Sequence, residues 1–294
     1  MIYLTGQDML NSSTIQLLRF HFSFFLMPVY WFSLSQVTEI EAGRAVFVFV
    51  ILHLLVYPAS NGYNSYMDRD TGSIGGIKNP KQPTRQLFYA SVLMDLAALV
   101  CSLFISSWFF AGILAFIVAS RAYSYRGIRL KKYPVPGYLT VIIFQGALVF
   151  FLVMHGCSSD MTLQVPAIGM IAASLLVGGF YPLTQIYQHM QDKEDGVTTL
   201  SYKLGYRGTF VFTAIIYVLA MISLGSLLAM NLELGKFFII QIFFAPVLVY
   251  FFWWFYKVYR NESAADFKNT MRMNMLASVC TNAAFIYLFL IEKV

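Results

Sequence analysis

Long apolar stretches alternate with short polar breaks along nearly the whole chain. A bilayer core of roughly 30 Å requires about 20 apolar residues in an α-helix, and the chain contains a series of stretches of that length. They are residues 15–35, 43–62, 87–106, 107–123, 137–155, 165–187, 208–230, 235–257 and 272–291. The pattern therefore predicts nine transmembrane helices.

The boundary between the third and fourth predicted helices follows from the length that a helix can have in a bilayer. Residues 87–123 form an almost continuous apolar run, and a single helix of that size would be roughly 55 Å long, well beyond the thickness of a bilayer core. We therefore expect a tight reversal of the chain at Ser106 and Ser107.

The residue composition defines the class of protein. Of the 294 residues, 59% are hydrophobic and 12% are charged, with a mean hydropathy of +0.66, whereas soluble domains are about 25% charged. These values exclude a water-soluble globule, a disordered chain and a barrel of alternating strands. We expect one all-α, polytopic membrane domain over residues 1–294. Three separated cysteines, Cys101, Cys157 and Cys280, suit packing better than a metal motif or a disulfide framework.

Basic residues are concentrated in alternate loops. Sixteen of the twenty lysines and arginines fall within residues 63–86, 121–136, 188–207 and 257–272. Because cytoplasmic loops are enriched in Lys and Arg, we predict a cytoplasmic N-terminus and an external C-terminus, in the bacterial inner (plasma) membrane. Topology thus explains the net charge of +6, and no nucleic-acid partner is expected. Residues 1–13 are polar and no cleavage site follows the first apolar run, so no cleavable signal peptide is expected.

Two polar segments, at the ends of the second and sixth predicted helices, resemble each other. Tyr57–Gly72 aligns without a gap with Tyr181–Gly196. The identical pairs are Tyr57/Tyr181, Pro58/Pro182, Tyr63/Tyr187, Asp68/Asp192 and Gly72/Gly196. The similarity predicts a duplicated four-helix unit, at approximately residues 15–136 and 137–272, with one additional helix.

Amide and acid side chains recur at the same spacing in both segments. They are Asn61, Asn64 and Asp68 in the first and Gln185, Gln188 and Asp192 in the second. Side chains at i, i+3 and i+7 share one helical face, and hard oxygen ligands of this kind suit Mg²⁺. Two such faces brought together would form a two-metal clamp for a diphosphate. The alternative is that they are ordinary polar residues at the membrane surface, but their repetition favours a functional site.

These segments resemble the two aspartate motifs of the UbiA superfamily of intramembrane prenyltransferases. The first motif, NxxxDxxxD, corresponds to Asn64–Gly72, and the second, DxxxDxxxG followed by Thr-Leu, corresponds to Gln188–Leu200. The segment Tyr123–Pro134 is similar to the basic loop between the fourth and fifth helices of that family. The resemblance covers essentially the whole chain, including the nine-helix count.

The resemblance implies Mg²⁺-dependent transfer of a prenyl group from an isoprenyl diphosphate to an aromatic or other lipophilic acceptor within the lipid bilayer. We accordingly expect Mg²⁺ ligands at Asn64, Asp68, Asp192 and Asp195, of which Asp68 and Asp192 are the catalytic residues. We expect substrate-binding roles for Arg19, Asn61, Tyr123, Arg129, Lys131, Gln185 and Gln188.

Two positions depart from the family pattern. Gly72 replaces the last aspartate of the first motif, and Gln188 replaces the first aspartate of the second. Neutral side chains bind Mg²⁺ more weakly, so either nearby acids compensate or the activity is altered. The acids in question are Asp70, Glu194 and Asp195.

Three functions are compatible with the sequence. The first is the prenyltransferase. The second keeps the fold and the metal site but cyclises the prenyl diphosphate or transfers another group. The third is a transporter or a non-catalytic membrane protein, but transporters usually bind at the midplane between broken helices, whereas the polar motifs here lie at span ends. Within the spans, His53 and Asp95 are expected to have structural partners.

Overall fold

A computed structural model describes residues 11–293. Residues 1–10 and 294 lie outside it, so most of the polar N-terminal segment, for which no cleavable signal peptide is expected, lies outside the described residues. Within the described part, nine helical segments are long and apolar enough to cross a membrane. They are Ser12–Ser35, Ala42–Asp68, Arg85–Leu103, Ser107–Ser124, Pro134–Cys157, Ala167–Glu194, Leu200–Met230, Leu234–Arg260 and Phe267–Ile291. The nine predicted spans and the all-α class are confirmed.

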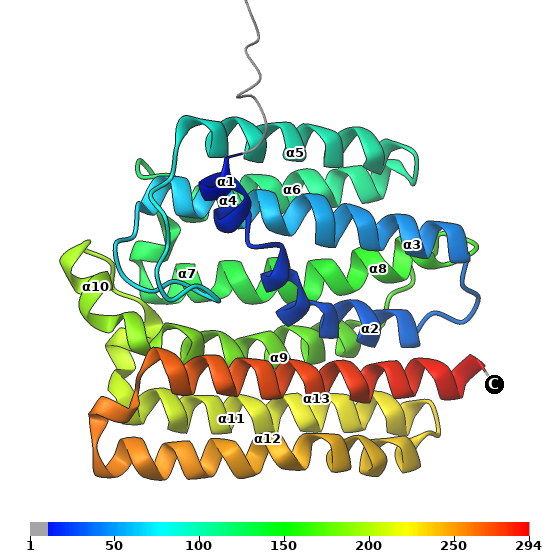
Figure 1. Cartoon of the computed structure of the whole chain (residues 1–294). Helices are drawn as coiled ribbons and strands as arrows, with labels where there is room; N and C mark the ends of the chain where they lie inside the picture. The colour runs from blue at the N-terminus through cyan, green and yellow to red at the C-terminus, as the bar shows by residue number, and fades with distance from the viewer. Residues whose placement is uncertain (1–10, 294) are drawn as a thin grey trace, which may run out of the picture.

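Several of these spans consist of more than one helical element, and Figure 1 shows the α-helices in place. In chain order the α-helices are α1 (Ser12–Leu18), α2 (Met27–Ser35), α3 (Ala42–Val50), α4 (Tyr57–Asp68), α5 (Arg85–Leu103), α6 (Ser107–Ser124), α7 (Pro134–Val141), α8 (Val149–Cys157), α9 (Ala167–Gln185), α10 (His189–Glu194), α11 (Leu200–Met230), α12 (Leu234–Arg260) and α13 (Phe267–Lys293). Short 3-10 segments are η1 (Phe20–Phe25), η3 (Leu130–Lys132), η5 (Ile186–Gln188) and η6 (Glu262–Ala264), and π-helical segments are η2 (Ile51–Val56) and η4 (Ile142–Leu148).

The reversal predicted at Ser106 and Ser107 is confirmed. Helix α5 ends at Leu103, and the Ser106 hydroxyl accepts a hydrogen bond from the backbone amide of Phe109 at 2.9 Å. This contact satisfies one of the backbone donors that the start of a helix leaves unpaired. Helices α5 and α6 then pack side by side.

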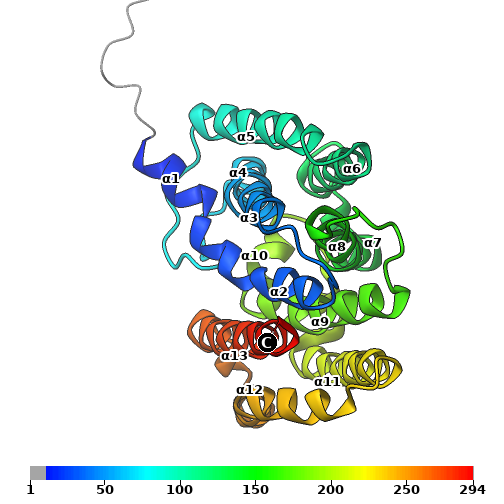
Figure 2. The same cartoon turned by 90° about the vertical axis from the view of Figure 1, so that its right-hand side faces the viewer.

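Aromatic rings pack helices from the beginning, middle and end of the chain against one another. The Phe32 ring of α2 stacks on Phe285 of α13 with the ring centroids 4.9 Å apart, and it contacts Phe150 of α8 at 5.1 Å. All three rings are buried. Viewed along the bundle in Figure 2, α2 accordingly lies beside α13. The first and last spans are therefore neighbours in space.

The predicted basic loops gather at one end of the bundle. The connections at 69–84, 125–133, 195–199 and 261–266 each follow a span that runs toward this end. In Figure 1, α10 and the α12–α13 connection lie there, opposite the far end of α13. We call it the motif end, because both polar segments reach it. The proposed duplication of residues 15–136 and 137–272 stays a prediction.

The two ionisable residues inside predicted spans are accommodated differently. Asp95 forms an ion pair with Arg121, whose guanidinium lies 3.9 Å from the centre of the Tyr63 ring, which confirms a structural partner for Asp95. His53 is buried against the ring of Phe49, with the ring centroids 4.4 Å apart. Neither ring nitrogen of His53 has a hydrogen-bond partner among residues 11–293, so aromatic packing takes the place of the expected polar partner.

A glycine allows the fifth span to approach α9 closely. Gly146 lies in the π-helical segment η4, and a Cβ atom at this position would lie 2.5 Å from the Cα atom of Ser174. That atom belongs to the backbone of α9 and cannot rotate away. Any side chain at position 146 would therefore push the two helices apart.

We expect Gly146→Ala to destabilise the protein by about 1–3 kcal/mol, the usual cost of overpacking a tight interface. The measurement is the midpoint of thermal unfolding in detergent micelles. Gly235→Ala is the matched control, because nothing lies within 4 Å of the Cβ atom that it would add. Equal midpoints for the two variants would contradict the close contact.

Candidate active site

The first polar segment forms one continuous helix, α4, which ends at Asp68. Asn61, Asn64 and Asp68 therefore share a helical face, as predicted. The side-chain amide of Asn64 donates to the Ser124 hydroxyl at 3.1 Å. Asp68 is only 8% exposed. Helix α4 thus carries an acid into a buried position at the motif end.

The C-terminal end of α4 is held by Arg126, from the loop after α6. Its guanidinium donates to the backbone carbonyls of Met67 at 2.7 Å and Asp68 at 3.2 Å. Such carbonyls lack partners within a helix, and a cation beside them also stabilises the helix dipole. The basic loop that contains Arg126 is evident in the sequence, but this role is not, since the pairing joins residues far apart in the chain.

The second polar segment is interrupted, contrary to the prediction of a single helical face. Helix α9 ends at Gln185, a 3-10 turn covers Ile186–Gln188, and α10 begins at His189. A 3-10 turn has about three residues per turn instead of about 3.6. The side chains of Gln185 and Gln188 therefore do not keep the predicted α-helical alignment with Asp192.

The two amides of the second segment bind different partners. Gln188 donates to the backbone carbonyl of Ser73, in the loop after α4, at 3.1 Å. Gln185 donates to the Tyr181 hydroxyl at 2.9 Å, and Tyr181 shares a hydrogen bond with Tyr123. Gln188 thus joins the two polar segments to each other, whereas Gln185 belongs to a cluster of tyrosine hydroxyls.

Ion pairs connect both polar segments to the basic loop. The Lys131 ammonium lies 2.5 Å from one carboxylate oxygen of Asp68, and Arg129 lies 3.7 Å from the other. Arg129 also pairs with Asp195, the residue that follows α10. One guanidinium therefore links acids from both segments in a single cluster.

Asp70, in the loop after α4, is affected in opposite directions by the acids and by the basic residues of this cluster. The pKa of Asp70 is raised to about 6, first because the carboxyl group is buried and second because Asp68 lies nearby. Lys131 and Arg19 act in the opposite direction. The carboxyl group of Asp192 is close enough to Lys131, Asp70 and Asp68 to interact with their charges. Acids from both segments thus crowd together, and a bound cation would stabilise such a group.

Arg19 reaches the site from the first span. It follows α1 with φ of 49° and is 7% exposed. The hydrogen bonds that its guanidinium makes to the described residues are long, at 3.4 Å each, and end on the backbone carbonyls of Asn61 and Gly75. Its Nε atom has no hydrogen-bond partner in the described part of the chain. A buried guanidinium with donors left over can bind an anion.

Gly72, the first departure from the motif, faces Gln191 of α10. A Cβ atom at position 72 would lie 2.5 Å from the Gln191 side-chain oxygen. The amide nitrogen of Gln191 donates to the Asp70 carboxylate at 2.6 Å. Gln191 therefore occupies the space that an aspartate at position 72 would need, and it ties Asp70 to the second segment.

The oxygen atoms of these acids suit a metal ion whose coordination is completed by a phosphate group. Over residues 11–293, no three acidic, histidine or cysteine side chains stand close enough to form a ready-made metal site. Mg²⁺ is usually held by one or two protein carboxylates together with phosphate oxygens and water. One carboxylate oxygen of Asp68 is buried and accepts no hydrogen bond from the described residues, so it is available as a ligand.

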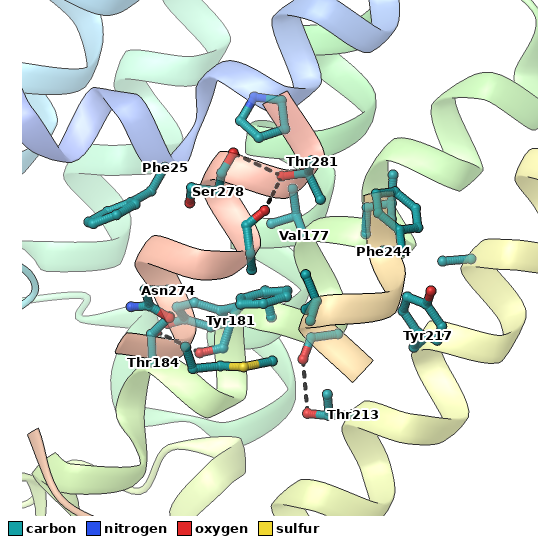
Figure 3. A pocket seen from close by; sticks show the side chains of 18 of the residues that line it. Phe25, Val177, Tyr181, Thr184, Thr213, Tyr217, Phe244, Asn274, Ser278 and Thr281 are labelled. Atoms are coloured by element: carbon teal, nitrogen blue, oxygen red, sulfur yellow. Dashed lines mark hydrogen bonds between the residues drawn. The ribbon is translucent and has the colours of Figure 1, made fainter. Parts of the chain in front are cut away.

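Two cavities lie among the helices that carry these residues. The larger, of about 430 Å³, has mainly apolar walls from η1, α9, α11, α12 and α13. Figure 3 shows it, with Phe25, Val177 and Phe244 among the side chains around it. The smaller, of about 120 Å³, lies between α4, α6, α7, η4 and α9. Tyr181 and Gln145 line both cavities.

Gln145 was not singled out by the sequence analysis. It is an uncharged polar residue inside an apolar span, and such residues are usually functional or paired. That signal could have identified it, but the sequence does not show which helices it faces.

The sequence profile of the UbiA prenyltransferase family matches residues 25–276. The chain belongs to this family. The resemblance drawn from the motifs is thereby confirmed, and membership in a family of prenyltransferases favours an enzyme over a transporter. No curated protein sequence matches the chain.

Solved structures of UbiA homologs share the fold. A homolog from Archaeoglobus fulgidus bound to DMAPP and Mg²⁺ has a TM-score of 0.69 at 17% identity, covering 95% of this chain and 99% of its own. The apo structure of a homolog from Aeropyrum pernix K1 has a TM-score of 0.68 at 15% identity, covering 92% and 98%. Digeranylgeranylglyceryl phosphate synthase has a TM-score of 0.61 at 18% identity, covering 94% and 98%.

The contact between Gly72 and Gln191 predicts what happens when the aspartate of the UbiA motif is restored at position 72. We expect Gly72→Asp to increase Mg²⁺ affinity, because the new side chain adds a carboxylate and displaces the Gln191 amide from Asp70. The displaced group is the end of a flexible side chain, so the substitution should be tolerated. The measurement is the Mg²⁺ concentration that half-maximally raises the thermal unfolding temperature in the presence of inorganic diphosphate.

Two variants separate the contributions to this effect. Gly72→Asn has the same shape without the charge, and Gln191→Ala releases Asp70 without adding an acid. Each should lower the half-maximal Mg²⁺ concentration by less than Gly72→Asp does. The same Mg²⁺ dependence for Gly72→Asn and Gly72→Asp would exclude a gain from the added carboxylate.

Proposed function

We propose that this member of the UbiA family transfers a prenyl group from an isoprenyl diphosphate to a lipophilic acceptor within the bilayer, and that the reaction requires Mg²⁺. The observation that carries the proposal is the proximity of a charged cluster to a large apolar cavity. The Arg19 guanidinium lies 5.3 Å from the centre of the Phe22 ring, and Phe22 lines that cavity. A prenyl diphosphate has the same two parts, a charged head and a hydrocarbon chain.

The solved homologs support this substrate class. The Archaeoglobus fulgidus homolog was determined with DMAPP and Mg²⁺ and also with GPP and Mg²⁺. Both ligands are isoprenyl diphosphates of different length. Since the present chain shares the fold over most of its length, the same class of donor substrate is proposed for it.

The proposed diphosphate ligands are Arg19, Arg129 and Lys131. Two of them already pair with acids, Lys131 with Asp68 and Arg129 with Asp195. The residues proposed to hold Mg²⁺ are Asn64, Asp68, Asp192 and Asp195. A bound metal would supply Lewis-acid stabilisation of the leaving diphosphate. Lys131 and Arg129 can turn to phosphate oxygens once these acids have another cation.

The proposed reaction begins with cleavage of the bond between prenyl C1 and a diphosphate oxygen. Both bonding electrons leave with the diphosphate, where Lys131, Arg129 and Arg19 stabilise the developing charge. An electron-rich atom of the acceptor then forms a bond to C1, and the proton that the acceptor loses passes to the released diphosphate. The apolar cavity keeps water from the carbocation, and aromatic faces such as those of Phe25 and Tyr217 stabilise it.

The two acids Asp68 and Asp192 should act as one unit. We expect Asp68→Asn and Asp192→Asn each to lower the rate of Mg²⁺-dependent pyrophosphate release from geranyl diphosphate by roughly 100-fold, and the double variant to lose little more. The assay uses purified protein with a panel of acceptors. Glu262→Gln, in the exposed connection before α13, is the control and should retain full activity.

Folding of each variant is checked by its thermal unfolding midpoint. Two small losses that multiply in the double variant would contradict a shared site. Pyrophosphate release that is unaffected by EDTA would contradict the metal requirement and the proposed roles of both acids.

We also propose that the motif end faces the cytoplasm, because its loops hold most of the basic residues. After replacement of the three native cysteines, single cysteines are placed at Lys78 in a motif-end loop and at Gln164 in an opposite loop. An impermeant maleimide added to intact cells should label only the cysteine at 164. Labelling of only the cysteine at 78 would reverse the proposed orientation, and labelling of both would contradict the span count.

A further inference from the structure

The smaller cavity, of about 120 Å³, has a polar lining inside the membrane-spanning bundle. Of the twelve residues around it, nine carry a hydroxyl or carboxamide group and none is charged. Ser60 and Ser120 share a hydrogen bond of 2.7 Å. The amide nitrogen of Asn61 is buried and has no hydrogen-bond partner among the described residues. Unpaired polar groups at this depth are costly unless an occupant uses them, so the cavity is suited to a polar occupant.

This cavity adjoins the proposed reaction centre. Asn64 lines it, and Asp68 follows one turn later on the same face of α4. Tyr123 and Tyr181 also line it, and both lie within electrostatic range of Asp68 and Asp192. Because Tyr181 lines the larger cavity as well, the two spaces share a wall. A molecule in the smaller cavity would face a prenyl group held in the larger one.

The backbone itself shapes this shared wall. Gln145, the second residue common to both cavities, lies in the π-helical segment η4. Such segments are rare and occur frequently at functional sites. The adjacent Gly146 lets η4 approach the backbone of Ser174 in α9. The position of Gln145 therefore depends on a helix distortion and a close helix contact that an ordinary structural span does not need.

We infer that the smaller cavity binds the acceptor, and that the acceptor is an uncharged molecule with a single ring and hydroxyl or carbonyl groups. This inference rests on the prenyl transfer proposed above. A cavity of roughly 150 Å³ accommodates benzene, so a volume of about 120 Å³ is on the scale of one ring rather than two.

Charge and hydrogen bonding decide the chemical class. A carboxylate in this cavity would find no cation in the lining, and burying an unpaired charge is strongly unfavourable. A hydroxyl or carbonyl group, in contrast, can accept from the unpaired amide of Asn61 and exchange hydrogen bonds with Ser60 and Ser120.

The decisive experiment compares two acceptors of nearly equal size, para-hydroxybenzamide and para-hydroxybenzoate, which differ in charge. Purified protein in nanodiscs receives Mg²⁺ and geranyl diphosphate, and the prenylated product is measured. We expect kcat/KM to be at least about tenfold higher for the amide, because only the carboxylate leaves a buried charge unpaired. Equal values, or a preference for the carboxylate, would overturn the inference. A dihydroxynaphthalene should likewise be a poorer acceptor than hydroquinone.

A cavity-filling variant tests the location. Ser120→Leu should lower kcat/KM for para-hydroxybenzamide by at least about tenfold, since the side chain takes the space of the ring. The affinity for geranyl diphosphate, measured by isothermal titration with Mg²⁺, should not change. Ser107→Leu, at the exposed far end of the same helix α6, is the matched control and should alter neither quantity. Unchanged transfer in Ser120→Leu would show that the cavity holds only water and would overturn the inference.

A binding measurement with the donor substrate distinguishes failure of this inference from failure of the proposed function. If geranyl diphosphate binds with Mg²⁺ and both para-substituted acceptors are prenylated alike, the inference about the acceptor fails while the proposed function stands. If geranyl diphosphate shows no Mg²⁺-dependent binding, the proposed function fails and the inference fails with it.

Discussion

The pairing of Asp68 with Lys131 and Arg129 is the interaction on which the rest of the site depends. A buried carboxylate without a nearby cation costs several kcal/mol, of the order of 3–5 when a partner is removed. The cations come from the loop after α6, so burying Asp68 requires this loop to fold over the end of α4. Arg129 also reaches Asp195. Charge compensation at the membrane edge thereby fixes three separate chain segments relative to one another.

The same constraint explains how the departures from the family motif are accommodated. Where the first motif would have its last aspartate, Gly72 leaves room for Gln191, which binds Asp70. A further carboxylate here would add negative charge to a group in which burial and Asp68 already raise the pKa of Asp70. The chain instead has a neutral contact between its two polar segments, and the Gln188 bond to Ser73 is a second contact of this kind. Both departures therefore replace repulsion between acids with hydrogen bonds between segments.

What could be predicted from the sequence depends on whether a feature is local. Span lengths follow from runs of apolar residues, and the reversal at Ser106 follows from helix length, so these were predicted correctly. The face of α4 also follows from spacing alone. The 3-10 turn after Gln185, the distortion at η4 and the position of Gln145 between two cavities lie where distant segments meet, near the Gln188–Ser73 hydrogen bond and the Gly146–Ser174 contact. A single sequence contains the residues for such contacts but does not show their pairing.

Charge balance also bears on the number of metal ions. Four carboxylates face three basic side chains in this cluster; they are Asp68, Asp70, Asp192 and Asp195, opposite Arg19, Arg129 and Lys131. A diphosphate brings about three negative charges and each Mg²⁺ brings two positive ones, and bound cations of this kind are the largest local charges in a site. With one Mg²⁺ the cluster would keep two uncompensated negative charges, whereas with two it would be neutral. At the edge of a bilayer, where uncompensated charge is costly, this count favours two Mg²⁺ ions over one in the proposed complex with a diphosphate.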